Sequence, residues 1–569
     1  MGAPGDVSFV SRTRQLAFTK PNEVLVARTI QEVLPALMRV ERFLADGNWA
    51  AGFIAYEAAP AFDSALASHS PGDLPLLWFG IYDQPCLPEF TPRNYTVGPW
   101  RAGVSESDYA ERVSRIRSYI GAGDTYQVNF TFPMFAAFSG DAQSWFHDLA
   151  RAQQADHCAY VHSGRFQLAC VSPELFFKLE SGALTMRPMK GTRARGRWTE
   201  EDKSTALELA RSPKDRAENV MIVDLIRNDM GRISEIGSVK VDSLFTVERY
   251  PTIWQMTSEI HSRTKASVSE ILAALFPSGS VTGAPKIRTM QIIRELESHR
   301  RGAYCGTIGW MAPDGSASFN VAIRCATIDT DNGSATYPVG SGITWDSLPE
   351  NEYAECRTKA AVLTDRRPPF ELLETILYSD GFFLLEEHLR RLAGSAEYFG
   401  IACDSESIRA LLQESTVGLG SETRRIRLLV DQTGFARLEV LPLSPARKVT
   451  LGFAPTPVNS KDIFLYHKTT RRDIYEAALK SRQDCADVIL WNEKGEITEC
   501  CTANIVADFE GTLCTPPVAC GLLAGTFRET LLREGRIVER VIAKEDLRHA
   551  RAVHLINSVR RWIPVDRIL

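Results

Sequence analysis

The chain has 569 residues, which is more than one ordinary domain of roughly 150 residues needs, so about three or four domains or fewer large ones are expected. Its 44% hydrophobic and 24% charged residues are typical of globular proteins and exclude a disordered chain. A net charge of -5 provides no general attraction to nucleic acid or acidic membranes.

The sequence also argues against export and membrane insertion. Residues 1–18 lack the apolar core of a signal peptide, and no stretch approaches the roughly 18 apolar residues of a membrane span. The twelve cysteines form no CxxC pair and no zinc-ligand spacing, which favours free thiols in a reducing compartment. We therefore expect a cytoplasmic metabolic protein that binds neither nucleic acid nor a membrane.

The first two-thirds of the chain alternate predicted helices with hairpins. Helical spacing covers residues 105–123 and 214–229, and residues 174–188 are predicted to form a hairpin around a Ser-Gly turn. Residues 304–339 are predicted to form three strands, broken at 313–315 and 331–333. Tight hairpins make antiparallel sheets, so a doubly wound parallel sheet is excluded.

A second pattern follows TDRRPP at 364–369, where prolines and arginines mark the expected boundary. Hairpins are predicted at 376–389, 425–443 and 488–499. The fold class is therefore α+β, with a first domain at 1–365 and a second at 370–569.

Five segments in the first half carry its chemistry. They are GDTYQVNFT (123–131), RPMKGTRARG (187–196), KDRAENVMIVDLIRND (214–229), GSVTGAPK (279–286) and VGSGITWDSLPENEYAECRTKA (339–360). In this order and spacing, residues 50–363 resemble the chorismate-utilising enzymes, which include anthranilate synthase, aminodeoxychorismate synthase component I and isochorismate synthases. The resemblance implies large antiparallel sheets with helices, around a central magnesium site.

Two pairs of carboxylates stand at i, i+3 on predicted helices, so each pair shares one helix face. The pairs are Asp215 with Glu218 and Glu352 with Glu355. Carboxylates suit Mg²⁺, and the resemblance makes Glu218 and Glu355 the stronger ligands, with Asp215 and Glu352 weaker. The alternative is surface ion pairing, because each segment has a lysine four residues from a glutamate.

Small residues in GSVTGAPK and VGSGI allow backbone amides to approach a substrate carboxylate, although such glycines often only form turns. The resemblance implies that the ring carboxylate binds at Thr282, Gly283, Gly340 and Gly342. It places the enolpyruvyl carboxylate at Tyr304 and Arg324, and the fork of an arginine suits that task.

Lys190, in PMKGT, decides the subfamily. Anthranilate synthases carry alanine at this position, whereas in aminodeoxychorismate synthases the lysine attacks ring C2 and expels the C4 hydroxyl. A free lysine has a pKa of ~10.4, so only about one in 2,000 is neutral at pH 7, and a nucleophilic role implies a depressed pKa. Arg187 and Arg193 could lower it by charge repulsion; the alternative is a lysine at the surface.

Gln255 departs from the family pattern, because many relatives have a histidine there. If that histidine assists departure of the hydroxyl, Gln255 acts only by hydrogen bonding, or another group serves. The acid–base assignment of the first half is incomplete.

The second half carries HLRRL (388–392), YHKTTRRDIY (466–475), NEKGEITE (492–499) and GLLAGTFR (521–528). Residues 370–569 thereby resemble the fold-type IV pyridoxal-phosphate enzymes, which include aminotransferases and aminodeoxychorismate lyase. By this resemblance Lys468 forms the Schiff base and Glu499 holds the pyridine nitrogen protonated. The residues implied at the phosphate are Arg391, Gly525, Thr526 and, more weakly, Ser558.

The two resemblances together imply consecutive steps toward folate: amination of chorismate, then loss of pyruvate to give 4-aminobenzoate. ELLETIL and NSVRRW favour the lyase. No G-x-C-x-G elbow of a glutamine amidotransferase is found, so a separate amidotransferase subunit is the expected ammonia source. Alternatives are an anthranilate synthase fused to a D-amino-acid or branched-chain aminotransferase, and a scaffold with a degenerate fold. The oligomeric state stays open, with a homodimer through the second half as one option.

Overall fold

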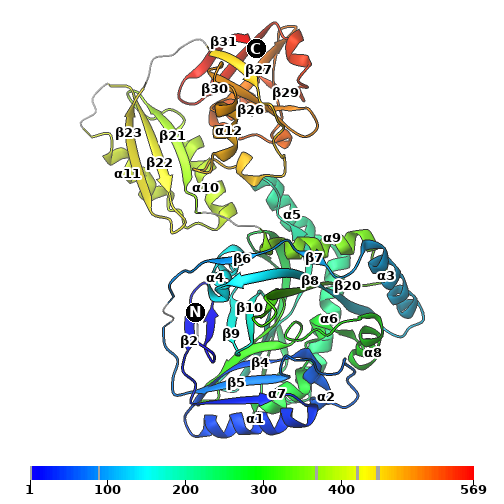
Figure 1. The fold of residues 1–569 in the computed structure, drawn as a ribbon. Coiled ribbons are helices and arrows are strands. Elements are labelled where there is room, and N and C mark those ends of the chain that lie inside the picture. Colours follow the sequence, from blue (N-terminus) through cyan, green and yellow to red (C-terminus); the bar gives the residue numbers. More distant parts are fainter. Residues whose placement is uncertain (1–2, 88–89, 365–368, 418–421, 444–448) are drawn as a thin grey trace. The chain divides into compact units, whose positions relative to one another are not determined.

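The computed structural model describes residues 3–87, 90–364, 369–417, 422–443 and 449–569. The chain divides into two compact units (Figure 1). The first unit contains Met1–Arg195 and Thr205–Arg367, and the second contains Gly196–Ser204 and Pro368–Leu569. Residues 365–368 of the predicted boundary segment lie outside the described residues.

The first unit is built on two large antiparallel sheets. In spatial order, the first sheet contains β16 (Gly283–Ala284), β8 (Gln127–Gly140), β20 (Ser334–Ile343), β19 (Cys325–Asp329), β10 (Phe166–Ser172), β9 (His157–His162), β1 (Val7–Val10) and β2 (Gln15–Phe18), and β6 (Tyr95–Val97) and β7 (Arg101–Ala102) also pair with β8. The second contains β13 (Met189–Ala194), β15 (Ile253–Arg263), β12 (Ala183–Arg187), β11 (Leu175–Glu180), β18 (Ala317–Val321), β17 (Thr307–Met311), β4 (Trp49–Ile54), β5 (Leu77–Tyr82) and β3 (Glu23–Ala27), with β14 (Lys240–Arg249) beside β15. The predicted antiparallel architecture is confirmed.

The first unit also contains helices, two of which were predicted from the sequence. The first unit contains α1 (Ile30–Ala45), α2 (Ala59–Phe62), α3 (Glu106–Gly121), α4 (Ala142–Gln153), α6 (Pro213–Gly231), α7 (Val268–Leu275), α8 (Lys286–Leu296) and α9 (Pro349–Ala360), while α5 (Thr199–Arg211) crosses the boundary at 204–205. The helices predicted at 105–123 and 214–229 are α3 and α6. Each begins at a serine whose hydroxyl accepts from a backbone amide of the first turn, Ser105 in α3 and Ser212 in α6.

The run from 304 to 339 contains four strands, so the prediction of three was wrong. The two predicted turns exist, since Gly315 and Gly333 both have positive φ. The missed break lies at Arg324, whose φ is +50°, between β18 in the second sheet and β19 in the first. The segment SFNVAIRCATI contains no glycine or proline, so nothing in the sequence marks this switch of sheets.

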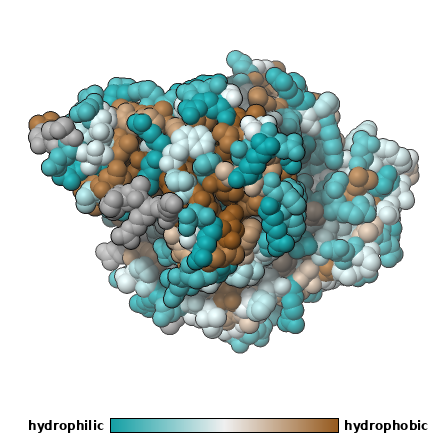
Figure 2. All heavy atoms as spheres, turned by 90° about the horizontal axis from the view of Figure 1, so that it is seen from above, coloured by the Kyte–Doolittle hydropathy of each residue, from teal (hydrophilic) through white to brown (hydrophobic). Residues whose placement is uncertain are grey.

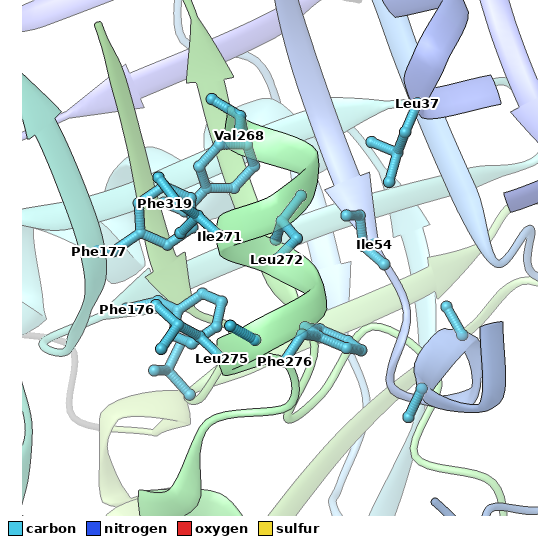
Figure 3. Packing of buried hydrophobic residues seen from close by; sticks show 14 of the residues in the cluster. Leu37, Ile54, Phe176, Phe177, Val268, Ile271, Leu272, Leu275, Phe276 and Phe319 are labelled. Atoms are coloured by element: carbon cyan, nitrogen blue, oxygen red, sulfur yellow. The ribbon is translucent and has the colours of Figure 1, made fainter. Parts of the chain in front are cut away.

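Helix α7 shows how the core of the first unit is filled. Its Ser267–Glu270 capping box fixes the start of the helix. From there Ile271, Leu272 and Leu275 point into a cluster of aromatic and aliphatic side chains that includes Phe176 (Figure 3). The first unit is therefore held by ordinary apolar packing around its second sheet.

The second unit also has two sheets. The smaller contains β21 (Leu372–Tyr378), β22 (Arg424–Val430) and β23 (Ala436–Pro442); the larger contains β26 (Ile497–Cys500), β25 (Asp487–Trp491), β24 (Val449–Phe453), β31 (Arg561–Ile568), β30 (Ala552–Asn557), β27 (Asn504–Phe509), β28 (Thr512–Thr515) and β29 (Val538–Glu539). The helices are α10 (Leu385–Phe399), α11 (Ser405–Glu414), α12 (Asp473–Ser481) and α13 (Thr526–Arg533). Helices and sheets are thus mixed in both units, which confirms the α+β prediction.

Of the three hairpins predicted here, two are confirmed, as β22–β23 and β25–β26. The prediction at 376–389 was wrong, because only Tyr378 and Phe382 form a bridge there and α10 begins at Leu385. The apolar run FFLLEEHL enters this helix through Leu384, whose φ is +55°. Its leucines continue at helical spacing into α10, which a short window of apolar residues does not reveal.

A short segment ahead of α5 is part of the second unit. The ring of Trp198 stacks on that of Tyr466 with centroids 5.3 Å apart. Arg197 donates to the carbonyl of Ala519 (3.2 Å), and the Tyr398 hydroxyl donates to the carbonyl of Gly196 (2.8 Å). Residues 196–204 therefore complete a unit whose other residues lie more than 160 positions further along the chain.

Hydrophilic residues cover much of the face seen in Figure 2, with hydrophobic residues between them. Within the described part of the chain, no helix combines the length and hydrophobicity that crossing a bilayer requires.

Candidate active sites

A cavity in the first unit collects most of the residues predicted for its site. Strand β13 contributes a lysine, and strand β20 contributes two glycines. Helices α6 and α9 contribute two carboxylates each. The predicted residues that line it are Lys190, Asp215, Glu218, Tyr304, Arg324, Gly340, Gly342, Glu352 and Glu355. Segments up to 165 positions apart in sequence thus meet at one cavity.

The amine of Lys190 is enclosed in this cavity. Burial lowers its pKa below 10.5, the negative charge of Glu218 opposes the shift, and the positive charge of Lys359 adds to it. Gly342 leaves room for the amine: a Cβ there would lie 3.2 Å from Lys190 Nζ and 2.2 Å from Gln127 Nε2. A side chain at position 342 would therefore collide with the groups around the lysine.

The two arginines expected to repel Lys190 have other partners. Arg187 pairs with Glu248, and Arg193 pairs with Asp215 at 2.8 Å. The cation that lowers the lysine's pKa most is Lys359, so that part of the prediction named the wrong residues.

Each of the predicted ion pairs with lysine exists and its members line the cavity, although the Lys214 side chain is also 47% exposed to solvent. Lys359 Nζ lies 2.7 Å from Glu355, and Lys214 Nζ lies 3.9 Å from Glu218 and 3.8 Å from Glu352. Burial raises the pKa of Glu218 to about 7. Burial also opposes ionisation of Glu355, but the adjacent Lys359 keeps its pKa below the usual value.

The donor chemistry of this cavity suits Mg²⁺. Among the described residues, no three carboxylate, histidine or cysteine side chains stand close enough to hold a metal by themselves. Mg²⁺ does not require such a cage, because it is commonly held by one or two carboxylates, substrate oxygens and water. Glu218 and Glu355 would serve as the protein ligands once their lysine contacts loosen.

The predicted carboxylate-binding residues divide into two groups. Tyr304 and Arg324 line the cavity beside Gly340 and Gly342. Of the described residues in the 279–286 segment, Ser280 and Val281 line the cavity, whereas Thr282 and Gly283 do not. The Thr282 hydroxyl donates to the carbonyl of Ser278 (3.0 Å), and Gly283 pairs with Val128 of β8.

Glu174, just before β11, is a cavity residue that the sequence analysis missed. Its carboxylate accepts a hydrogen bond from the Ser280 hydroxyl (2.5 Å), and burial raises its pKa to about 7. Gln255 donates to the carbonyl of Gly191 (2.9 Å) and so holds the residue next to Lys190. The one available signal was a carboxylate at the head of an apolar strand, in SPELFF.

A second cavity, in the second unit, brings together every residue predicted for the pyridoxal-phosphate site. They are Arg391, Lys468, Glu499, Gly525, Thr526 and Ser558. They come from α10, the loop before α12, β26, the start of α13 and the loop after β30.

Burial shifts the pKa values of Lys468 and Glu499 in opposite directions. Burial lowers the pKa of Lys468 to about 8, and the charge of Arg391 adds to the shift. Burial raises the pKa of Glu499 to about 7. Its oxygens accept from the Tyr475 hydroxyl (2.8 Å) and from Asn504 Nδ2 (3.1 Å), so the carboxyl has a fixed orientation.

The phosphate side of the cavity is cationic and rigid. Arg391 donates twice to Glu374, at 2.8 and 2.6 Å, and Glu374 also contacts His388 Nδ1 at 2.6 Å. Gly525 caps α13 and Thr526 is its first residue, so backbone amides at a positive helix end face this side. A fixed arginine, a helix start, a buried amine and a buried carboxyl together fit pyridoxal phosphate.

Two family models match the chain: "chorismate binding enzyme" over residues 87–365 and "Amino-transferase class IV" over residues 371–568. Anthranilate synthase component 1 of Methanothermobacter marburgensis is 32% identical, over 55% of this chain and 73% of that relative. Aminodeoxychorismate synthase component 1 of Klebsiella aerogenes is 39% identical, over 51% of this chain and 64% of the relative. The chain thus spans less than two-thirds of that relative.

A solved structure shows the same fold in the first unit. Anthranilate synthase component I of Streptococcus pneumoniae matches with a TM-score of 0.52 and 24% identity, over 64% of this chain and 90% of that one. Chorismate-binding enzymes use Mg²⁺, and class IV aminotransferase domains use pyridoxal phosphate. The chain belongs to the chorismate-binding enzymes, and its second unit is a class IV aminotransferase domain.

Proposed function

We propose that this chain converts chorismate to 4-aminobenzoate for folate synthesis in the cytoplasm, by two consecutive reactions assigned to residues 1–365 and 370–569. The observation that carries the proposal is the buried amine of Lys190 in the carboxylate-lined cavity. The relatives named aminodeoxychorismate synthase component 1 and the class IV aminotransferase domain support it.

In the first reaction, Lys190 is the nucleophile. Its neutral amine attacks ring C2 of chorismate as the C4 hydroxyl leaves, ammonia then adds at C4, and the C2–N bond to the lysine breaks. Arg324 and Tyr304 hold the enolpyruvyl carboxylate. Glu218 and Glu355 would hold Mg²⁺, which neutralises charge on the substrate's ring carboxylate. The product is 4-amino-4-deoxychorismate.

We propose Glu174 as the group that gives the departing hydroxyl its proton, because Gln255 cannot titrate and Glu218 is assigned to Mg²⁺. With a pKa of about 7, Glu174 is partly protonated near neutrality. Lys190, in contrast, must lose its proton. The rate should therefore fall at low pH as Lys190 becomes charged, and at high pH as Glu174 becomes ionised.

We predict that Glu174→Gln lowers the rate of chorismate amination by on the order of 10²- to 10⁴-fold, the usual cost of losing a positioned acid. The alkaline limb of the pH–rate profile should also disappear, whereas the acidic limb due to Lys190 should remain. Glu180→Gln, at the exposed end of β11, is the control. An unchanged alkaline limb in Glu174→Gln would assign the proton to another group.

In the second reaction, Lys468 removes the proton at ring C4 and Glu499 keeps the pyridine nitrogen protonated. Pyridoxal phosphate supplies the electron sink for the charge left at C4. The C3–O bond then breaks, the enolpyruvyl group leaves and is protonated to pyruvate, and the ring becomes aromatic. Formation of the aromatic ring draws the reaction forward.

The test of the whole proposal is to incubate the chain with chorismate, ammonium, Mg²⁺ and pyridoxal phosphate and to identify the products. We expect 4-aminobenzoate and pyruvate in equal amounts. Anthranilate as the aromatic product, or amino-group exchange between amino acids and 2-oxo acids, would instead establish the alternative of an anthranilate synthase fused to an aminotransferase.

The nitrogen source gives a separate prediction. The sequence contains no G-x-C-x-G nucleophile elbow, so we propose that glutamine is used only through a separate amidotransferase subunit. The purified chain should turn over chorismate with ammonium and not with glutamine, and an added amidotransferase partner should restore glutamine-dependent turnover. Glutamate release from glutamine by the purified chain alone would contradict this.

A further inference from the structure

Strand β22 presents two arginines to the second cavity, Arg425 and Arg427. We propose that this pair binds the two carboxylates of the substrate and so selects a dicarboxylate for the second reaction. The inference rests on the proposed function, because 4-amino-4-deoxychorismate carries one carboxylate on its ring and one on its enolpyruvyl group.

The strand directs both side chains to the cavity. The side chains of residues 424–430 point alternately to the two faces of the strand. Ile426, Leu428 and Val430 share one face and are fully buried in the core formed with α10 and α11. The opposite face carries Arg425 and Arg427. On the neighbouring strand β21, Thr375 pairs with Arg427 and also lines the cavity. A strand with one apolar face therefore offers arginines on the face toward the cavity.

The cavity has more positive charge than the cofactor's phosphate needs. Its described lining has six cationic and two acidic side chains: Arg391, Arg425, Arg427, Lys468, Arg472 and Arg560, against Asp487 and Glu499. The Asp487 carboxylate accepts from the amides of Val488 and Cys501 and from Thr502, which fixes its position. Two of these arginines also pair with glutamates outside the lining, Arg391 with Glu374 and Arg427 with Glu439. The positive charge that remains suits an anionic substrate.

Two other cations of the cavity, Arg391 and Arg472, are already engaged. Arg391 is held by Glu374, and Arg472 donates to the carbonyl of Cys501 and lies 4.5 Å from the centroid of the Tyr475 ring. These contacts fix Arg391 and Arg472 in the wall.

Arg425 and Arg427 have donors to spare. The Nε of Arg425 is buried and has no hydrogen-bond partner, which is unfavourable unless a ligand supplies an acceptor. Arg427 donates one Nη1 hydrogen bond to Glu439 (2.7 Å), and its side chain remains 34% exposed. A guanidinium has five N–H donors, so Arg427 can bind a carboxylate without releasing Glu439.

The spacing of the pair matches the chemistry of the substrate. Residues i and i+2 of a strand are roughly 6.6 Å apart and point the same way. Two carboxylates separated by part of a six-membered ring and an enol ether can reach both guanidinium groups at once. An ordinary amino acid with a single carboxylate would use only one of them.

The test combines kinetics with a binding measurement. Purified 4-amino-4-deoxychorismate is supplied to the holoenzyme and to its Arg425→Gln and Arg427→Gln variants. Each variant should raise KM by roughly ten- to a hundredfold, the usual effect of losing one charge-assisted hydrogen bond. Arg424→Gln, on the same strand but on the opposite face and paired with the exposed Glu422, is the matched control and should leave KM unchanged.

The second measurement requires no turnover. Isophthalate, an aromatic dicarboxylate, and benzoate are titrated into the holoenzyme while the absorbance of bound pyridoxal phosphate is followed. Isophthalate should bind at least about tenfold more tightly than benzoate. Both arginine variants should lose this preference and keep the cofactor spectrum. Retention of KM and of the preference in the variants would overturn the inference.

The two outcomes separate the inference from the proposed function. If the unmodified holoenzyme releases no pyruvate from 4-amino-4-deoxychorismate, the proposed function fails, while the isophthalate titration still tests the arginine pair. If pyruvate is released but neither variant differs from Arg424→Gln, the function stands and the assignment of the pair is wrong.

Discussion

Replacing Lys190 with alanine is expected to reduce 4-aminobenzoate formation from chorismate by on the order of 10³-fold or more. The variant loses the only amine that the proposal uses as a nucleophile, and water or a neighbouring lysine cannot take its place. The physical reason is the position of this amine, which lies in the cavity beside Gly342, where a Cβ would be only 3.2 Å from Lys190 Nζ. Chorismate consumption and aromatic products would be measured together.

Two controls make this result interpretable. Lys178→Ala removes an exposed lysine on β11 that pairs with Glu180, and should have normal activity. The Lys190→Ala chain should still release pyruvate from supplied 4-amino-4-deoxychorismate, because no residue of the second cavity has changed. Traces of anthranilate are expected, since alanine recreates the anthranilate-type sequence. Full activity would rule out the covalent role.

Replacing Lys468 with alanine is expected to separate the two reactions. Chorismate consumption should continue at a near-normal rate, but 4-amino-4-deoxychorismate should accumulate and pyruvate release should fall by on the order of 10²- to 10⁴-fold. The amine lost is both the anchor of the cofactor and the proposed acceptor of the C4 proton. Its depressed pKa of about 8 gives the unmodified chain a sizeable fraction of neutral amine near pH 8.

A rescue experiment and a control variant test the expected effect of Lys468→Ala. A separately added aminodeoxychorismate lyase should restore 4-aminobenzoate from the accumulated intermediate. Lys461→Ala, an exposed lysine on the loop before the site, should behave as the unmodified chain. Unaided 4-aminobenzoate formation by Lys468→Ala would mean that another group performs the step, and loss of chorismate consumption would mean that the two reactions depend on each other.

Local signals in the sequence predicted helices and most hairpins well. The helical spacing of residues 214–229 predicted α6, whose first turns carry Asp215 and Glu218. Glycine at 434 and 495 marked two of the turns in the second unit. These features are encoded within a few residues, so one sequence suffices to predict them.

Features that depend on distant segments could not be predicted in the same way. Arg324 takes a left-handed conformation without being glycine, where the chain passes from one sheet to the other, and Leu384 enters a helix from a left-handed conformation. Glu174 and Lys359 acquire their roles only because strands and helices far apart in sequence enclose them. The roles of the individual site residues, and the assignment of activities to 1–365 and 370–569, remain predictions until the variants are measured.

The stretch from Gly196 to Ser204 bears on how the second unit could be produced alone. A recombinant protein starting near residue 370 would lack the indole that covers the Tyr466 ring and the carbonyl that accepts from the Tyr398 hydroxyl. Tyr466 stands two positions before Lys468, so the newly exposed ring would lie beside the lysine that is proposed to form the Schiff base. If the gene were split into two separate enzymes, the one without residues 196–204 would therefore expose the Tyr466 ring. That enzyme would need either those nine residues or substitutions that bury the ring.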